Sequence, residues 1–139
     1  MVVSRKRMET VIEFIASNVE RDLSLSVLAS VAGVSPHHFA QLFKQITGLS
    51  PHQYVLQTRI DRAKTHLVDL DVSVGAISRL TGFSTQEHFT KVFRRLVGIT
   101  PSKFRRTVVA IDEQAVATSQ NDPDSEDIGH IAQFGRQHR

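Results

Sequence analysis

The sequence repeats one pattern of helix caps, glycines and aromatic residues, and this repeat restricts the possible folds more than any other feature. The first part returns after 49 positions, in the pairs Ser24 and Ser73, Gly33 and Gly82, and Ser35 and Ser84. The second part returns after 50 positions, in the pairs Phe39 and Phe89, Phe43 and Phe93, Gly48 and Gly98, Pro51 and Pro101, and Tyr54 and Phe104. One residue inserted in the second turn explains the change of offset. A duplicated structural unit is therefore expected.

Each copy predicts a short helix, a glycine turn and a longer amphipathic helix. The apolar positions of the short helices are Val27, Leu28, Val31 and Ala76, Ile77, Leu80. Those of the longer helices have the spacing of one buried stripe and are Phe39, Leu42, Phe43, Ile46 and Phe89, Val92, Phe93, Leu96. Their opposite faces are polar: His37, Ala40, Gln41, Lys44 and Glu87, Thr90, Lys91, Arg94. A short helix that supports a longer one with a polar, basic outer face is typical of a helix-turn-helix.

Two further helices are predicted around these units. Apolar residues at helical spacing (Met8, Val11, Ile12, Ile15, Ala16, Val19) predict a helix over residues 5–19. Ser50-Pro51 begins the longest helix, residues 51–69, with Leu56, Ile60, Ala63, Leu67 and Leu70 on its buried side. Nineteen residues span about 28 Å as a helix. The predicted fold class is all-α, with a stiff helix between two helix-turn-helix units. The five phenylalanines 39, 43, 89, 93 and 104 are predicted to be core rather than a base-stacking surface.

The charge distribution favours a polyanionic partner. Residues 1–107 contain 15 Lys and Arg against 8 Asp and Glu, a net charge of +7, whereas residues 108–139 contain 2 against 6. Basic domains of this kind are suited to nucleic acid. The sequence has no signal peptide and no apolar run long enough for a membrane helix. A protein of the cytoplasm, associated with the nucleoid, is therefore expected.

The sequence does not favour catalysis. There is no cysteine, which excludes disulfides, zinc–thiolate sites and thiol chemistry. The adjacent histidines His37 and His38 point to different faces of a helix, and no HExxH-like pair exists. The acidic residues form no buried-looking pair, and no glycine-rich phosphate loop follows a strand. We expect no enzyme activity, no metal and no cofactor.

Three runs of residues resemble one protein family. LSLSVLASVAGVSPHHFAQLFKQITGLSPHQYV is similar to the first helix-turn-helix of the AraC/XylS transcription regulators, RIDRAKTHL to their linker helix, and GFSTQEHFTKVFRRLVGITPSKFRR to their second helix-turn-helix. The resemblance covers about residues 8–107 and implies a seven-helix domain over residues 5–107. Its helix-turn-helix units would lie at about 24–47 and 73–97, joined by a linker helix at 51–69.

The resemblance also implies a function. The family binds double-stranded DNA in a sequence-specific manner, reading two adjacent major-groove segments with two recognition helices. Larger members carry a separate effector-binding domain, which is not recognisable here, so the chain looks like the small members that bind as monomers. An activator that contacts RNA polymerase is expected. Two alternatives remain: a protein-interaction module bound to polymerase, and a truncated regulator that occupies operators without responding to an effector.

The family's base-contacting positions correspond here to His37, Ala40, Gln41, Gln86, Glu87, His88, Thr90 and Lys91. Gln41 and Gln86 suit adenine, Lys91 suits guanine, Thr90 suits the thymine methyl group, and Ala40 offers only an apolar contact. Glu87 has a competing interpretation, in which Ser84 to Glu87 form a capping box. His37 and His88 could instead touch only phosphate or water.

A second set of residues is predicted to contact phosphates without reading the sequence. Its members are Lys44, Arg79, Arg94 and Arg95, with the helix-start amides at Ser24 and Ser73. For Arg59 and Arg62, salt bridges within the linker helix and simple exposure are both open.

The acidic C-terminal segment, residues 108–139, is predicted to be mostly disordered. Residues 108–117 could extend a helix, but residues 120–127 (QNDPDSED) are polar, acidic and interrupted by proline. The segment could be a solvated tail, or it could compete with DNA for the basic face.

Overall fold

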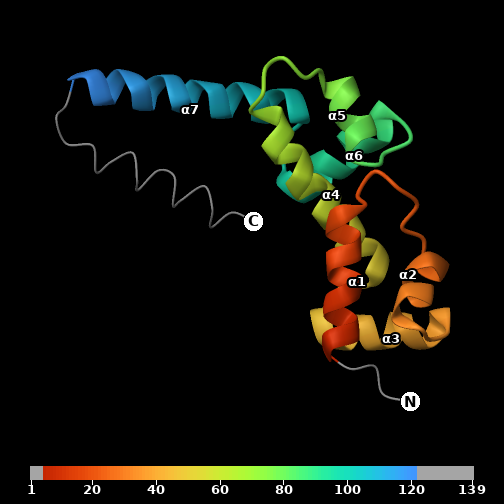
Figure 1. Cartoon of the computed structure of the whole chain (residues 1–139). Coiled ribbons are helices and arrows are strands. Elements are labelled where there is room, and N and C mark those ends of the chain that lie inside the picture. Colours follow the sequence, from red (N-terminus) through yellow and green to blue (C-terminus); the bar gives the residue numbers. More distant parts are fainter. Residues whose placement is uncertain (1–4, 122–139) are drawn as a thin grey trace.

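The computed structural model describes residues 5–121, and side-chain surroundings as far as residue 114. Within this range the chain is all-helical (Figure 1). The helices are α1 (Arg5–Ser17), α2 (Leu25–Ala32), α3 (Pro36–Thr47), α4 (Pro51–Leu67), α5 (Val74–Leu80), α6 (Gln86–Val97) and α7 (Pro101–Asn121). The predicted seven-helix, all-α architecture is confirmed. None of these described helices is long and apolar enough to cross a membrane.

Local sequence explains most helix starts. Ser35 and Ser50 accept a hydrogen bond from the third backbone N–H of their helices, and a proline follows each in the first helical position. Ser50 and Gln53 form a complete capping box, with distances of 3.1 and 3.2 Å. Two ends differ from the prediction, because α1 stops at Ser17 rather than residue 19 and α4 at Leu67 rather than residue 69. With 17 residues, α4 is about 25 Å long.

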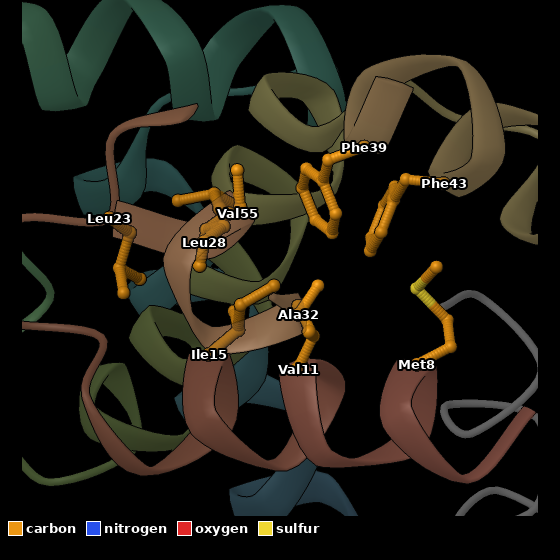
Figure 2. Close-up of a cluster of buried hydrophobic side chains, with 10 residues drawn as sticks. Met8, Val11, Ile15, Leu23, Leu28, Ala32, Phe39, Phe43 and Val55 are labelled. Carbon is orange, nitrogen blue, oxygen red and sulfur yellow. The ribbon is translucent and has the colours of Figure 1, made fainter. Parts of the chain in front are cut away.

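Two separate hydrophobic cores lie on either side of α4. The first joins α1, α2 and α3 to Val55 of α4, and Figure 2 shows its α1 side chains directed toward Phe39 and Phe43. The second joins α5 and α6 to Leu56, Ile60, Ala63 and Leu67 of α4. Val55 and Leu56, neighbours in sequence, therefore enter different cores. The long helix is a shared wall of both units.

The aromatic residues are core, as predicted. Phe39, Phe43, Phe89 and Phe93 are completely buried. The duplication extends to ring packing: Tyr54 lies edge-on to Phe43 with ring centroids 5.2 Å apart, and Phe104 lies edge-on to Phe93 at 5.5 Å. Each helix that follows a recognition helix thus closes the core with an aromatic residue at its fourth position.

Four apolar residues predicted to be buried are exposed. Their exposed fractions are 52% for Ile46, 62% for Leu70, 49% for Leu80 and 40% for Leu96. Ile46, Leu80 and Leu96 lie in the last turn of their helices, and Leu70 lies beyond the end of α4. The helical period gives the direction of a side chain, but it does not say whether another element covers that position.

α7 continues well past the predicted domain end at residue 107 and projects from the rest of the molecule (Figure 1). The helix covers residues 108–117, where an extension was considered possible, and also Gln120 and Asn121, where disorder was predicted. The remainder of the predicted disordered segment, residues 122–139, lies outside the described residues.

Candidate nucleic-acid interface

The second recognition helix, α6, begins one residue later than a Ser84 cap would require. Thr85 is the N-cap, and its Oγ1 accepts a hydrogen bond from the backbone N–H of His88 at 3.1 Å. A capping box needs a Glu or Gln side chain at the third helical position, as Gln53 is in α4. That position is occupied by His88, so the predicted Ser84–Glu87 box does not form. The inserted residue of the second turn accounts for the shift, and it leaves Glu87 exposed in the first turn.

Four of the predicted base-reading residues of α6 lie together. Gln86, Glu87, Thr90 and Lys91 line one shallow hollow on the surface of this helix. Gln86, Glu87 and Lys91 are exposed, and Thr90 is half-buried. Within residues 5–121 the recorded ion pair is between Lys64 and Asp61, so neither Glu87 nor Lys91 is neutralised by a described neighbour. The hollow offers amide, carboxylate, hydroxyl and ammonium groups, which are the groups that pair with base edges in the major groove.

His88 is placed differently from these four residues. Its ring lies edge-on to Phe83, with the ring centroids 5.5 Å apart, and it does not line the hollow. Phe83 itself is buried in the second core. His88 therefore packs beside the turn, although it remains exposed.

Gly75 contributes to the site in a way that the motif did not indicate. A methyl group at Gly75 would lie 3.1 Å from Oε1 of Gln86. The start of α5 and the start of α6 are therefore close, and the missing side chain leaves room for Gln86. The corresponding residue of the first copy is Ser26, so the two recognition surfaces are not equivalent here.

The first recognition helix, α3, has a simpler outer face. His37 and Gln41 are exposed, and Ala40 is half-buried between them and the core. Lys44 follows in the last turn and is exposed. The structure thus brings the three predicted base-reading residues of this helix onto one face.

The four basic side chains predicted to contact phosphates are exposed, and so are the two residues whose helix-start amides were predicted to do so: Lys44, Arg79, Arg94 and Arg95, with Ser24 and Ser73. Arg94 and Arg95 lie in the last turn of α6. Ser73 caps α5 and accepts from the backbone N–H of Ala76 at 3.0 Å. Ser24 is the N-cap of α2 by backbone conformation, but its side chain makes no cap hydrogen bond.

The amide of Ser24 already has an anionic partner. Its N–H donates to Oδ1 of Asp22 at 2.9 Å. A carboxylate beside this helix start opposes a phosphate there, because like charges repel. The N–H of Ser73 makes no such bond among the described contacts, although Asp71 stands at the position that corresponds to Asp22.

Arg59 and Arg62 bond to carbonyl oxygens of the first unit and form no salt bridge within α4. Arg59 donates to the carbonyl oxygens of Val19 at 2.9 Å and Arg21 at 2.8 Å, and Arg62 donates to that of Ala16 at 2.8 Å. Burial lowers the pKa of the Arg59 guanidinium, and nearby Asp22 opposes this effect. These bonds hold the segment where α1 ends and α2 begins.

Arg105, which the sequence did not single out, does the same for the second unit. From α7 it donates to the carbonyl oxygens of Leu67 at 2.9 Å, Asp69 at 3.0 Å and Val72. It therefore holds the loop between α4 and α5. In the described part of the chain, no group of His, Asp and Glu residues is arranged to hold a metal ion.

Comparison with known proteins agrees with this geometry. A model of a helix-turn-helix domain matches residues 28–107, more than half of the chain. A crystal structure of a transcriptional regulator from Chromobacterium violaceum, described as containing an AraC-type DNA-binding domain, is 31% identical with a TM-score of 0.68. The match covers 73% of this chain and 91% of that one. The chain belongs to the AraC family of helix-turn-helix regulators.

Curated transcriptional regulators are also similar to this chain. LumQ of Photobacterium leiognathi, described as a probable transcriptional regulator, is 35% identical over 103 residues, or 74% of this chain and 42% of its own length. AdaA of Bacillus subtilis, described as a bifunctional transcriptional activator and DNA repair enzyme, is 30% identical over 71% of this chain and 47% of its own length. The chain thus spans less than half the length of these relatives. The DNA-binding domain of AdpA, solved with a target DNA, has the same fold, with a TM-score of 0.68 at 23% identity.

Proposed function

We propose that this AraC-type protein binds double-stranded DNA in a sequence-specific manner as a monomer, with α3 and α6 in adjacent major-groove segments. It then activates transcription by contact with RNA polymerase, on the nucleoid in the cytoplasm. The observation that carries the proposal is the pair of exposed polar faces, His37–Ala40–Gln41 on α3 and Gln86–Glu87–Thr90–Lys91 on α6, on two units that share one helix.

The chemistry of the two faces differs. The α6 face offers two long side chains with amide or ammonium groups, a carboxylate and a hydroxyl around one hollow. The α3 face offers an amide and an imidazole on either side of a methyl group. Because each bidentate pair contributes about 1–3 kcal/mol of discrimination, the second half-site should be the more strictly defined.

α4 is shorter than the spacing of adjacent major-groove segments. α4 spans about 25 Å, whereas adjacent major-groove segments on one face of a duplex are about 34–36 Å apart. The flanking loops supply part of the difference. A bend in the duplex supplies the rest, at a cost that depends on the base sequence between the half-sites.

The test is selection of bound duplexes from a random library, with the wild type and with Gln41→Ala and Lys91→Ala. Each substitution should relax one position of the selected motif by about 1–3 kcal/mol, in the first and second half-site respectively. Gln114→Ala, an exposed residue of α7, and Lys64→Ala, the lysine that pairs with Asp61, are the matched controls. A motif unchanged by both test substitutions contradicts the assignment of the two faces.

A reporter with the selected operator then separates the modes of regulation. An activator raises transcription when its site lies upstream of the promoter, and this stimulation should disappear when polymerase contact is blocked while DNA occupancy persists. A protein that only occupies its operator lowers transcription from a site that overlaps the promoter and stimulates none. Mass measurement of the protein–DNA complex should give one protein per operator.

A further inference from the structure

Within the described residues, the two helix-turn-helix units approach each other closely at Gly82, away from the axis of α4. Gly82, in the turn before α6, has a φ of +87°, and a Cβ atom there would lie 2.1 Å from the carbonyl oxygen of Val19. The same Cβ would lie 2.8 Å from Nε and 2.9 Å from Cζ of Arg59. The turn of the second unit therefore rests directly on the segment between α1 and α2 of the first unit and on a side chain of α4.

Arg59 joins the three parts of this contact. Its Nε donates to the carbonyl oxygen of Val19 at 2.9 Å, and its Nη2 donates to that of Arg21 at 2.8 Å. The guanidinium also lies close to Gly82, so that a side chain there would meet its Nε and Cζ. A lysine carries its three donors on one atom at the end of a flexible chain, so it lacks the rigid planar fork with which Arg59 reaches both carbonyl oxygens.

This contact matters because the hydrophobic cores do not connect the units. Each core takes its own residues from α4, and the two clusters share no member. Two bodies that share only one helix can rotate slightly relative to each other when that helix bends or twists. A second contact beside the axis removes that rotation.

We propose that the junction of Val19, Arg59 and Gly82 sets the distance and rotational phase between the two recognition helices, and so selects the spacing between operator half-sites. Arg59 is a positioning residue and contacts no base. The inference rests on the proposed function, since it requires that α3 and α6 bind one duplex together. One base pair of B-DNA changes the separation by about 3.4 Å and the phase by about 35°, so a rigid junction distinguishes spacers that differ by one pair.

The repeat supplies a matched control. Gly33 corresponds to Gly82 in sequence and has a similar φ of +75°. A Cβ at Gly33 would meet only Nη1 of Arg7, at 3.4 Å. Gly33→Ala therefore introduces the same left-handed strain as Gly82→Ala without pushing the two units apart.

The experiment measures binding of the full chain to duplexes that carry both selected half-sites at the preferred spacing and with one base pair added or removed. For the wild type, one pair should weaken binding by about tenfold or more, the scale of a mismatched base pair. Gly82→Ala and Arg59→Gln should reduce this ratio to below about threefold while base preference within each half-site persists. Arg59→Lys should be intermediate, and Gly33→Ala should keep the wild-type ratio.

The outcomes separate the two levels of the proposal. If wild-type protein shows base preference in only one half-site, the proposed two-helix function fails. If both half-sites are read but the spacing profile is flat, or if folded Arg59→Gln keeps the wild-type ratio, the junction inference alone is overturned. Circular dichroism establishes which variants are folded, and Arg59→Gln and Arg59→Lys decide the question if Gly82→Ala does not fold.

Discussion

The salt dependence of DNA binding tests the electrostatic part of the interface. Lys44, Arg79, Arg94 and Arg95 are exposed, and none has an ion pair with a described residue. If each neutralises one phosphate, the log–log slope of affinity against salt should be about −3.6, because each contact contributes about −0.9. Affinity should then fall by about 150-fold between 50 and 200 mM salt. Replacing both Arg94 and Arg95 by glutamine should reduce the slope to about −1.8, or a fall of about 12-fold.

Fluorescence anisotropy with a random duplex measures this slope without a contribution from base reading. Lys64→Gln is the control, because Nζ of Lys64 lies 3.9 Å from Oδ1 of Asp61 and this cation is already partly neutralised. The reasoning is refuted if the double variant keeps the wild-type slope, or if Lys64→Gln lowers it as much. A flat response with no binding at low salt would favour the protein-interaction module over the DNA-binding function.

Three further predictions concern stability. Phe93→Ala should lower the free energy of unfolding, measured in urea, by about 3–5 kcal/mol, because the ring is completely buried. Leu96→Ala, one turn later, should lower it by less than about 1 kcal/mol, because Leu96 is exposed. Equal losses would contradict this packing. Arg105→Gln should cost about 2 kcal/mol by thermal melting, because three carbonyl oxygens after α4 lose a charged donor. Thr85→Ala should lower the free energy of unfolding by about 1 kcal/mol, because Thr85 caps α6. Glu87→Gln should lower it by only a few tenths of a kcal/mol in 0.15 M salt, because Glu87 does not cap the helix. The reverse order would support the capping-box interpretation of Glu87.

Local signals predicted the helices and the aromatic cores well. Ser35-Pro36 and Ser50-Pro51 are sufficient to place two helix starts, because a cap and a fixed proline φ act within a few residues. The predicted start of α6 was wrong by one residue. Ser84 and Thr85 can both cap a helix, and the repeat does not say where the inserted residue lies. That displacement changed the interpretation of Glu87 from a capping residue to an exposed one.

The arginine contacts could not be predicted from the sequence. Arg59 bonds to a carbonyl 40 residues earlier, and Arg105 to carbonyls 33 to 38 residues earlier. No periodicity or cap motif encodes such a partner, because it depends on where α1 and α4 end in space. For Arg59 the sequence left two interpretations open, a salt bridge within the helix or simple exposure. Neither describes the hydrogen bonds that it makes to carbonyl oxygens of the first unit.

α4 takes part in both copies of the repeat. As the last helix of the first unit it supplies Tyr54 to close the core beside Phe43, and as the first helix of the second unit it supplies the wall on which α5 and α6 pack. α7 then takes for the second unit the place that α4 takes for the first, with Phe104 against Phe93. Arg59 and Arg105 make equivalent contacts. Each comes from the last helix of its unit, α4 or α7, and bonds to carbonyl oxygens that precede the short helix of the same unit, α2 or α5. They stand 46 positions apart rather than 49 or 50, so the duplicated feature is the contact and not the position. A unit cut from this chain at α4 would leave its neighbour without one of the two helices that enclose its core, so we expect neither unit to fold without the other.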